Sequence, residues 1–204
     1  MTLVDLSHPI TPGMPVWPGD PEVSTSVAAT IGSHGYNLLA LHLGSQTGTH
    51  VDAPFHVDEA LPTLDQLPLE RFTGPAWVVD LRGHVGAIRP DDLPDLPAGS
   101  VLLLHTGWSA HWGTERYGDH PWLDPHTARE IVAAGIRTVG IDAPSIDRPG
   151  DTALPSHHVL ARAGAVIAEN LTNLDAVPDG AVAWLLPLPL AGADGAPVRA
   201  VAVF

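Results

Sequence analysis

The sequence predicts a mixed α/β fold, with α+β character, built mostly from short strands with few helices. Three observations lead to this prediction. The 204 residues include 20 glycines and 21 prolines, which interrupt regular structure along the whole chain. Several short runs have the alternation or the apolar content of strands, and only two segments carry helix signals. No repeat, linker or change in composition divides the chain, so we expect one domain over residues 1–204.

The first part of the chain is predicted to form a strand, a turn and a second strand. Residues 4–7 are short and alternating, and residues 17–21 are a dense turn signal. In residues 36–43 leucine recurs at positions 39, 41 and 43, which is the period of a strand. A dense group of histidine and carboxylate side chains begins shortly after this strand, at His50.

Two buried strands and one helix are predicted in the middle of the chain. Residues 76–81 and 100–105 are apolar enough for buried strands, and the Pro/Asp-rich residues 88–99 between them are predicted to be a loop. Residues 124–135 have the signals of a short helix. Asp124 is the expected N-cap, Pro125 takes the first helical position and Gly135 ends the helix.

The last part of the chain alternates strands with one more helix. Residues 138–142 and 165–169 are predicted strands that each end at an acidic residue. Residues 156–164 are predicted to form a short helix with Ser156 as its N-cap. Residues 181–188 and 198–204 are expected to be the final strands.

Composition excludes several classes of function. A formal charge of −14 disfavours binding to the phosphate backbone of nucleic acids. The absence of cysteine excludes disulfides, thiolate zinc sites and thiol nucleophiles. No apolar run reaches the roughly 18 residues that span a membrane, and the first residues do not resemble a signal peptide. We therefore expect a cytoplasmic protein with no nucleic-acid or membrane partner.

His50 and Asp52 form the core of a candidate metal site. In an extended chain, residues two apart point to the same side, so both side chains can bind one cation. Gly48 and Pro54 frame the pair, and His56 returns near it without being required as a ligand. Imidazole with carboxylate suits Zn²⁺, Mn²⁺ or Fe²⁺. The simpler alternative is a pair of surface histidines beside a turn, and the Gly/Pro frame favours the site.

A second candidate group lies far along the chain. His157 and His158 stand near the start of the second predicted helix, and Glu169 ends the strand that follows it. A helix that runs antiparallel to the next strand begins near that strand's end, which would bring His157 close to Glu169. Taken alone, a pair of histidines at a helix start more often caps the helix or lies in solvent.

The segment Gln46–Thr47–Gly48–Thr49–His50–Val51–Asp52–Ala53–Pro54–Phe55–His56 resembles a known signature. That signature, His-x-Gly-Thr-His-x-Asp-x-Pro-x-His, belongs to the metal-dependent cyclase/kynurenine formamidase (arylformamidase) family. Further blocks at residues 16–20, 64–70, 140–147, 156–158 and 168–171 extend the resemblance along the whole chain. It implies a swivelling β/β/α domain, one or two divalent ions such as Zn²⁺ or Mn²⁺, and a homodimer or homotetramer.

Site residues follow from the resemblance, position by position. His50 and Asp52 fall on metal-ligand positions, with Asp52 able to bridge two ions, and His157 and Glu169 fall on ligand positions for the second ion. His56 falls on the catalytic histidine. Trp17 falls on an aromatic residue that lines the substrate pocket. The implied reaction is hydrolysis of an amide-type bond in a small aromatic substrate.

Gln46 departs from the family pattern, because it stands where the first histidine ligand is expected. An amide oxygen binds metals more weakly than imidazole does. Either Gln46 still binds, favouring a harder ion such as Mn²⁺, or that metal position is weak or empty and one ion remains. His42 could substitute, although a solvated or pocket-wall histidine is the favoured interpretation.

Several functions fit these features. An aryl formamide such as N-formylkynurenine, an intermediate of tryptophan catabolism, is the first choice of substrate. A cyclic amide or lactone, as in isatin-hydrolase-like members, or a natural-product cyclase is the second. A non-catalytic, ligand-binding member is the third, and Gln46 is its only support. The aromatic residues of 105–123 are expected either to shape the pocket or to pack an interface between subunits.

Overall fold

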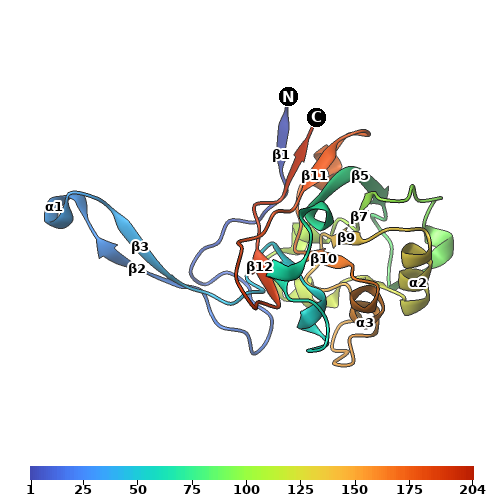
Figure 1. Ribbon diagram of the computed structural model, residues 1–204, viewed down its shortest axis with the longest axis horizontal. Helices are drawn as coiled ribbons and strands as arrows, with labels where there is room; N and C mark the ends of the chain where they lie inside the picture. The colour runs from blue at the N-terminus through green and yellow to red at the C-terminus, as the bar shows by residue number, and fades with distance from the viewer.

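A nine-stranded mixed sheet forms the centre of the computed structural model, which describes residues 1–204 (Figure 1). Its strand order is β1-β13-β11-β5-β7-β9-β10-β4-β12. The four central strands β5, β7, β9 and β10 run parallel, and antiparallel strands flank them on both sides. The strands are β1 (Leu3–Asp5), β4 (His50–Asp52), β5 (Thr73–Asp80), β7 (Val101–His105), β9 (Thr138–Ile141), β10 (Val166–Glu169), β11 (Val182–Trp184), β12 (Gly195–Pro197) and β13 (Val201–Val203).

The remaining elements are short. Two small sheets pair β2 (Ser24–Ala29) with β3 (Leu38–His42), and β6 (Ala87–Ile88) with β8 (Trp122–Leu123). The α-helices are α1 (Ile31–His34), α2 (Pro125–Ala133) and α3 (Pro155–Arg162), and single 3₁₀ turns fill several connections. None of these helices has the length and apolar character that crossing a bilayer requires. The prediction of a mixed α/β fold with short strands and few helices is confirmed.

Apolar clusters cover the central sheet on both faces. Leu103 of β7 belongs to one cluster, whereas its neighbours Leu102 and Leu104 belong to the other, because successive side chains of a strand point to opposite faces. All residues of β7 are buried, as predicted. The predicted buried strand at 76–81 is only half-buried, since Trp77 of β5 is 39% exposed.

Helix α2 follows its sequence signals. The Asp124 side chain accepts a hydrogen bond from the His126 backbone N–H at 2.7 Å, and Pro125 is the first helical residue. Gly135 has a positive φ of 86°, the left-handed conformation that commonly follows a helix end.

Helix α3 begins differently from the prediction. It starts at Pro155, so Ser156 lies inside the helix and is not its N-cap. The Ser156 hydroxyl instead donates to the Leu123 carbonyl at 2.7 Å. The capping role passes to Asp147, a residue distant in sequence, whose carboxylate accepts the backbone N–H groups of Ser156 and His157 at 2.8 and 3.0 Å. Asp147 therefore fixes the helix turn that carries His157.

The strand predicted at 36–43 is present as β3, but it does not join the central sheet. It pairs with β2 in a hairpin that projects from the body, with α1 at its tip (Figure 1). We call residues 24–42 the arm. Strands β2 and β12 were not predicted, and the two predicted final strands shorten to Val182–Trp184 and Val201–Val203.

Candidate metal centre

Strand pairing assembles the candidate metal centre. Strand β4 lies between β10 and β12 and is antiparallel to both. Its register places His50 opposite Glu169 and Asp52 opposite Ile167. Residues directly opposite each other on paired strands share a face of the sheet, as do residues two apart. His50, Asp52 and Glu169 therefore project from one face, although Glu169 lies far from the other two in sequence.

His157 joins these three side chains to complete a closed ring in which imidazole and carboxylate alternate. His50 Nε2 lies 3.5 Å from Asp52 Oδ1 and 3.6 Å from Glu169 Oε2. His157 Nε2 lies 3.6 Å from Asp52 Oδ2 and 3.3 Å from Glu169 Oε1. Each carboxylate thus turns one oxygen to each histidine. We call these four residues the acceptor ring.

Hydrogen bonds to groups outside the acceptor ring determine which imidazole nitrogen of His50 and of His157 faces into it. His50 Nδ1 donates to the Gly48 carbonyl at 2.8 Å, and His157 Nδ1 donates to Asp147 Oδ2 at 2.7 Å. In the neutral imidazoles both Nε2 atoms are therefore unprotonated acceptors. They face carboxylate oxygens, which are acceptors as well.

Four buried acceptors around one space require protons or a cation. Both oxygens of Asp52 are buried and have no hydrogen-bond partner. Such a group is costly to bury unless it is paired or binds a metal. Two ligands of one ion bound at about 2.0–2.2 Å lie roughly 3.3–3.6 Å apart, and each neighbouring nitrogen–oxygen pair of the ring has such a separation, with each carboxylate using a different oxygen for each histidine. The ligating atoms of His50, Asp52 and Glu169 also lie within 4.8 Å of one another. These residues fit a divalent ion.

The pKa shifts of the acceptor-ring residues also favour a cation at this position. Burial lowers the pKa of His157, but Asp147, Asp52 and Glu169 outweigh burial and raise it well above the ordinary imidazole value. Burial raises the pKa of Asp52, yet the adjacent His50 and His157 lower it overall. Positive charge is therefore favoured inside the ring.

Two residues that hold the acceptor ring in place, Asp147 and Asn170, were not predicted as site residues from the sequence. Asp147 holds His157 through its ring nitrogen as well as through its backbone. Such carboxylate–histidine pairs orient metal-binding imidazoles. Asn170, in a left-handed conformation, donates to the same Gly48 carbonyl that holds His50, and it accepts from the buried Tyr117 hydroxyl at 2.8 Å. The conformational signal of Asn170 cannot be seen in a single sequence.

Gly195 of β12 is required by close packing. It is the strand partner of Asp52. A Cβ atom at this position would lie 2.5 Å from the Val51 carbonyl oxygen, 2.7 Å from Gln46 Nε2 and 3.4 Å from Asp52 Oδ1. The missing side chain leaves the space into which Gln46 reaches toward the ring.

His56 and Gln46 lie beside the ring and share a partner that the sequence did not indicate. Asp194, just before β12, places Oδ2 3.2 Å from His56 Nδ1 and 2.9 Å from Gln46 Nε2. The His56 ring lies beside His157, with ring centres 5.9 Å apart, and its side chain is 27% exposed. Burial lowers the pKa of His56, but Asp194 and Asp52 raise it overall. The Gln46 oxygen is buried without a hydrogen-bond partner.

The turn that contains Trp17 lies close to this group. The backbone N–H of Asp20 donates to the Trp17 carbonyl at 2.9 Å. Burial raises the pKa of Asp20, while the nearby imidazoles of His50 and His56 act in the opposite direction. The Trp17 side chain is 42% exposed and remains free to contact another molecule.

Aromatic residues of 105–123 pack against residues that hold the strand of His50 in place. Trp112 stacks on His8 at 4.0 Å and meets Tyr117 edge-on. The backbone N–H of His8 donates to the Thr49 hydroxyl, next to His50. His42, considered as a substitute ligand, is exposed on the arm and takes no part in the ring.

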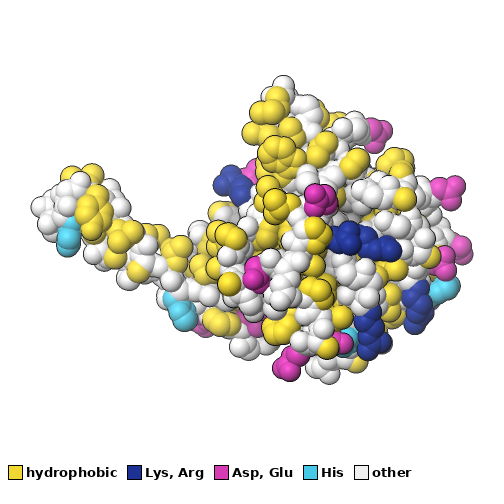
Figure 2. Space-filling view, viewed as in Figure 1, with side chains coloured by type: hydrophobic (Ala, Val, Ile, Leu, Met, Phe, Trp, Pro, Cys, Tyr) yellow, Lys and Arg dark blue, Asp and Glu magenta, His cyan; other side chains and the backbone are white.

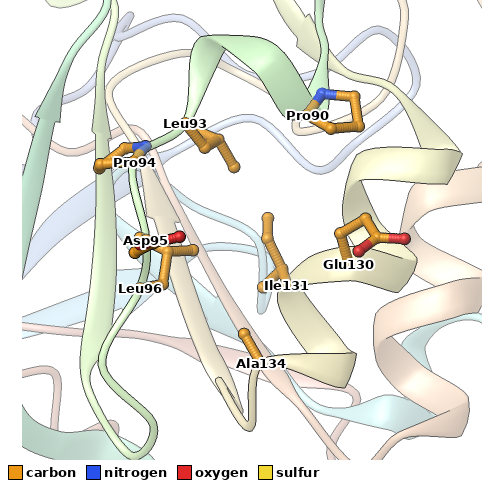
Figure 3. A pocket seen from close by; sticks show the side chains of 8 residues that line it. All are labelled: Pro90, Leu93, Pro94, Asp95, Leu96, Glu130, Ile131 and Ala134. Atoms are coloured by element: carbon orange, nitrogen blue, oxygen red, sulfur yellow. The ribbon is translucent and has the colours of Figure 1, made fainter.

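A separate cavity of about 220 Å³ lies between the 90–96 loop and α2 (Figure 3). Apolar side chains such as Leu93, Leu96 and Ile131 line it, with Asp95 and Glu130 at its sides. None of its lining residues belongs to the acceptor ring, so this cavity is separate from the candidate centre.

Comparison with known families and proteins gives consistent results. A family model described as "Putative cyclase" matches residues 4–148. The kynurenine formamidase of Salinibacter ruber is 39% identical over 205 residues, covering 98% of this chain and 97% of that protein.

The chain is also similar in structure to solved hydrolases over nearly its whole length. Isatin hydrolase A from Labrenzia aggregata, bound to benzyl benzoate, superposes with a TM-score of 0.90 at 25% identity, covering 98% of this chain and 93% of the other. A potential metal-dependent hydrolase with cyclase activity has a TM-score of 0.82 at 31% identity, with coverage of 98% and 96%.

Proposed function

This chain belongs to the cyclase family, and from that premise we propose that it is a metal-dependent hydrolase of an amide-type bond in a small aromatic substrate. The observation that carries the proposal is the acceptor ring, four buried acceptor side chains spaced as ligands of a divalent ion. An aryl formamide such as N-formylkynurenine is the proposed substrate. The greater identity to a kynurenine formamidase, 39% against 25% to an isatin hydrolase, favours it.

The proposed metal ligands are His50, Asp52, His157 and Glu169. When bound by these residues, a divalent ion would polarise a substrate carbonyl and would lower the pKa of a water molecule toward about 7. Each carboxylate directs one oxygen to each histidine, so these four residues would hold one ion or two. Histidine and carboxylate ligands suit Zn²⁺ and Mn²⁺ alike.

Gln46 is proposed as a weak, additional ligand. Its amide oxygen is buried and unpartnered, so an oxygen ligand is available where the family pattern has an imidazole. Oxygen ligands suit Mn²⁺ better than softer ions. This favours Mn²⁺ over Zn²⁺ at the position nearest Gln46.

His56 is the proposed proton-transfer residue. Its Nδ1 is directed to Asp194, so its Nε2 is left to take and return a proton. The His56 side chain is partly exposed beside the buried acceptor ring, so a substrate can reach it. During hydrolysis His56 would deliver that proton to the departing amine. Trp17, on the neighbouring turn, is proposed to stack on the aromatic part of the substrate.

A cyclic amide of the isatin type is the second candidate substrate. The structural likeness to an isatin hydrolase at a TM-score of 0.90 supports it. A non-catalytic role is less consistent with the molecule, because the ring and His56 are both present and Gln46 alone departs from the family signature.

A substrate panel tests this proposal. The purified enzyme, loaded with Zn²⁺ or with Mn²⁺, is assayed on N-formylkynurenine, formanilide and isatin. We expect the formamides to have the higher kcat/KM. Faster turnover of isatin would support the second candidate, and no turnover of any compound by metal-loaded protein would overturn the hydrolase proposal.

Self-association through the arm is proposed as well. The arm contains no Asp, Glu, Lys or Arg in a chain with a net charge of −14, so two copies meet there with least repulsion. Val27, Ile31 and Leu41 are 69%, 66% and 62% exposed, and Figure 2 shows hydrophobic side chains along the projection. An isolated two-stranded hairpin is marginally stable in water. A second copy of this chain is therefore the proposed cover, giving a homodimer.

We also propose that the chain forms one domain. The nine-stranded sheet contains both the first strand and the last, which supports one domain over residues 1–204. A cytoplasmic location stays a prediction from the sequence.

A further inference from the structure

Asp194 occupies a fixed position between two residues of the candidate site. Its backbone carbonyl accepts the Ala53 N–H at 2.8 Å, and the next residue, Gly195, begins the strand that pairs with β4. The Asp194 side chain points from this anchored backbone to Gln46 and His56. Pairing with β4 therefore sets the position of the carboxylate.

One carboxylate oxygen serves two nitrogen donors. Gln46 Nε2 only donates, and it lies 2.9 Å from Asp194 Oδ2. His56 Nδ1 lies 3.2 Å from the same oxygen, so this nitrogen also carries a hydrogen. The 3.3 Å distance between Gln46 Nε2 and His56 Nδ1 then separates two donors and is not a hydrogen bond. A reversed amide would place its oxygen against the carboxylate, with no hydrogen between them.

Two consequences follow from this assignment. His56 is held with its hydrogen on Nδ1, and its Nε2 is left as the free acceptor. The Gln46 amide is held with its nitrogen on Asp194, and its oxygen is left buried and unpartnered. One carboxylate thus determines which atom of each side chain is available for chemistry.

We propose that Asp194 is a positioning residue that fixes the ring tautomer of His56 and the amide orientation of Gln46. Its catalytic consequence rests on the proposed hydrolysis, whereas its effect on the tautomer does not. Asp194 acts through the other two residues and does not itself need to touch the substrate. Because its side chain is 33% exposed, water can solvate the loop when the carboxylate is replaced, and the fold is expected to survive.

The test compares Asp194→Asn with wild type and with Asp179→Asn. Asparagine keeps the volume but removes the charge, so its amide oxygen is a weaker acceptor than a carboxylate oxygen. Its amide nitrogen replaces the second oxygen and can present a hydrogen to His56 Nδ1, which a carboxylate never does. Asp179 is an exposed carboxylate elsewhere and controls for the loss of one charge. Asp194→Glu is the conservative variant and should recover part of any loss.

Nitrogen NMR of the His56 ring in metal-free protein, at a pH that keeps the ring neutral, gives a readout independent of activity. We expect a hydrogen on Nδ1 in wild type and in Asp179→Asn, and a shift of the hydrogen toward Nε2 in Asp194→Asn. An unchanged tautomer in Asp194→Asn would overturn the proposal. This readout still decides the question if no tested substrate is hydrolysed.

Kinetics give the second readout. We expect kcat of Asp194→Asn to fall about 10–100-fold, the usual cost of losing an orienting partner. KM should change less than about threefold. In saturating metal, the metal content should equal that of wild type, because the acceptor ring is intact and Gln46 is only a weak additional ligand. Wild-type kcat would contradict the proposal, as would a loss of bound metal large enough to account for the loss of activity.

Discussion

Glu169 and His50 lie opposite each other on adjacent antiparallel strands, β10 and β4, although they are 119 positions apart in the sequence. This register brings Glu169 Oε2 to 3.6 Å from His50 Nε2. The position of the centre is therefore set by backbone pairing, and α3 contributes only His157. A centre built on paired strands is held by main-chain hydrogen bonds and should keep its geometry without metal.

Removal of metal is expected to lower stability without unfolding the protein at room temperature. An ion that binds only the folded state stabilises it by about 2.7 kcal/mol at a free concentration 100 times Kd. Chelation should therefore lower Tm by several degrees, and Zn²⁺ or Mn²⁺ should restore it. Calorimetry with Asp52→Asn as the control, in which metal should raise Tm little, checks this prediction. An equal response to metal in that variant would place the stabilising ion elsewhere.

Stabilisation by metal should increase as pH rises. In metal-free protein the pKa of His157 is raised, so the stability that its proton contributes is present below the ordinary imidazole pKa. That contribution is lost as pH rises through the folded-state pKa. Metal binding requires the neutral ring and competes with the proton. The difference in Tm between metal-bound and metal-free protein is thus expected to grow from about pH 5 to pH 8. A constant difference would argue against His157 as a ligand.

Gln46→His is expected to strengthen metal binding. Imidazole is the better ligand for Zn²⁺, and Asp194 already lies where it can accept a hydrogen from the new ring. Zn²⁺ affinity should rise by about tenfold or more, with little gain for Mn²⁺. Titration calorimetry with metal analysis measures both affinity and stoichiometry. If neither differs from wild type, Gln46 does not weaken the centre.

His56→Ala should keep the metal and lose most turnover. The His56 ring is not part of the acceptor ring, and proton transfer by a positioned side chain contributes about 10²–10⁴-fold to rate. His42→Ala, on the exposed arm, is the matched control and should keep wild-type kcat. Turnover by His56→Ala near the wild-type rate would remove His56 from the mechanism.

The arm is expected to control assembly. Replacing Leu39 and Leu41 together by Lys puts charge on an apolar, exposed hairpin and should convert a dimer into a monomer. Val85→Lys, at a position that is 90% exposed and outside the arm, is the control and should remain dimeric. Sedimentation velocity distinguishes these states. A dimer that persists in the arm variant would show that the interface lies on another surface.

Local patterns predicted much of the fold and some of the site. The period of two around His50 and Asp52, and the helix-to-strand connection between His157 and Glu169, led to the group of residues that the structure brings together. Asp147 and Asp194 were not singled out, because their partners lie at least 9 and 138 positions away and no local pattern records such contacts. The arm was predicted only as an apolar strand, since a period of two does not distinguish a core strand from an exposed hairpin.

Metal-dependent turnover at the acceptor ring is tested most directly by titration. Metal-depleted wild type and Asp52→Asn are titrated with Zn²⁺ or Mn²⁺ while hydrolysis of N-formylkynurenine and bound metal are measured together. Wild-type activity should be near zero without metal and should rise in proportion to bound ion. Asp52→Asn should stay folded but bind little metal and remain inactive. Full activity of metal-depleted wild type, or metal-loaded activity of Asp52→Asn equal to wild type, would contradict a metal-dependent hydrolase at this centre.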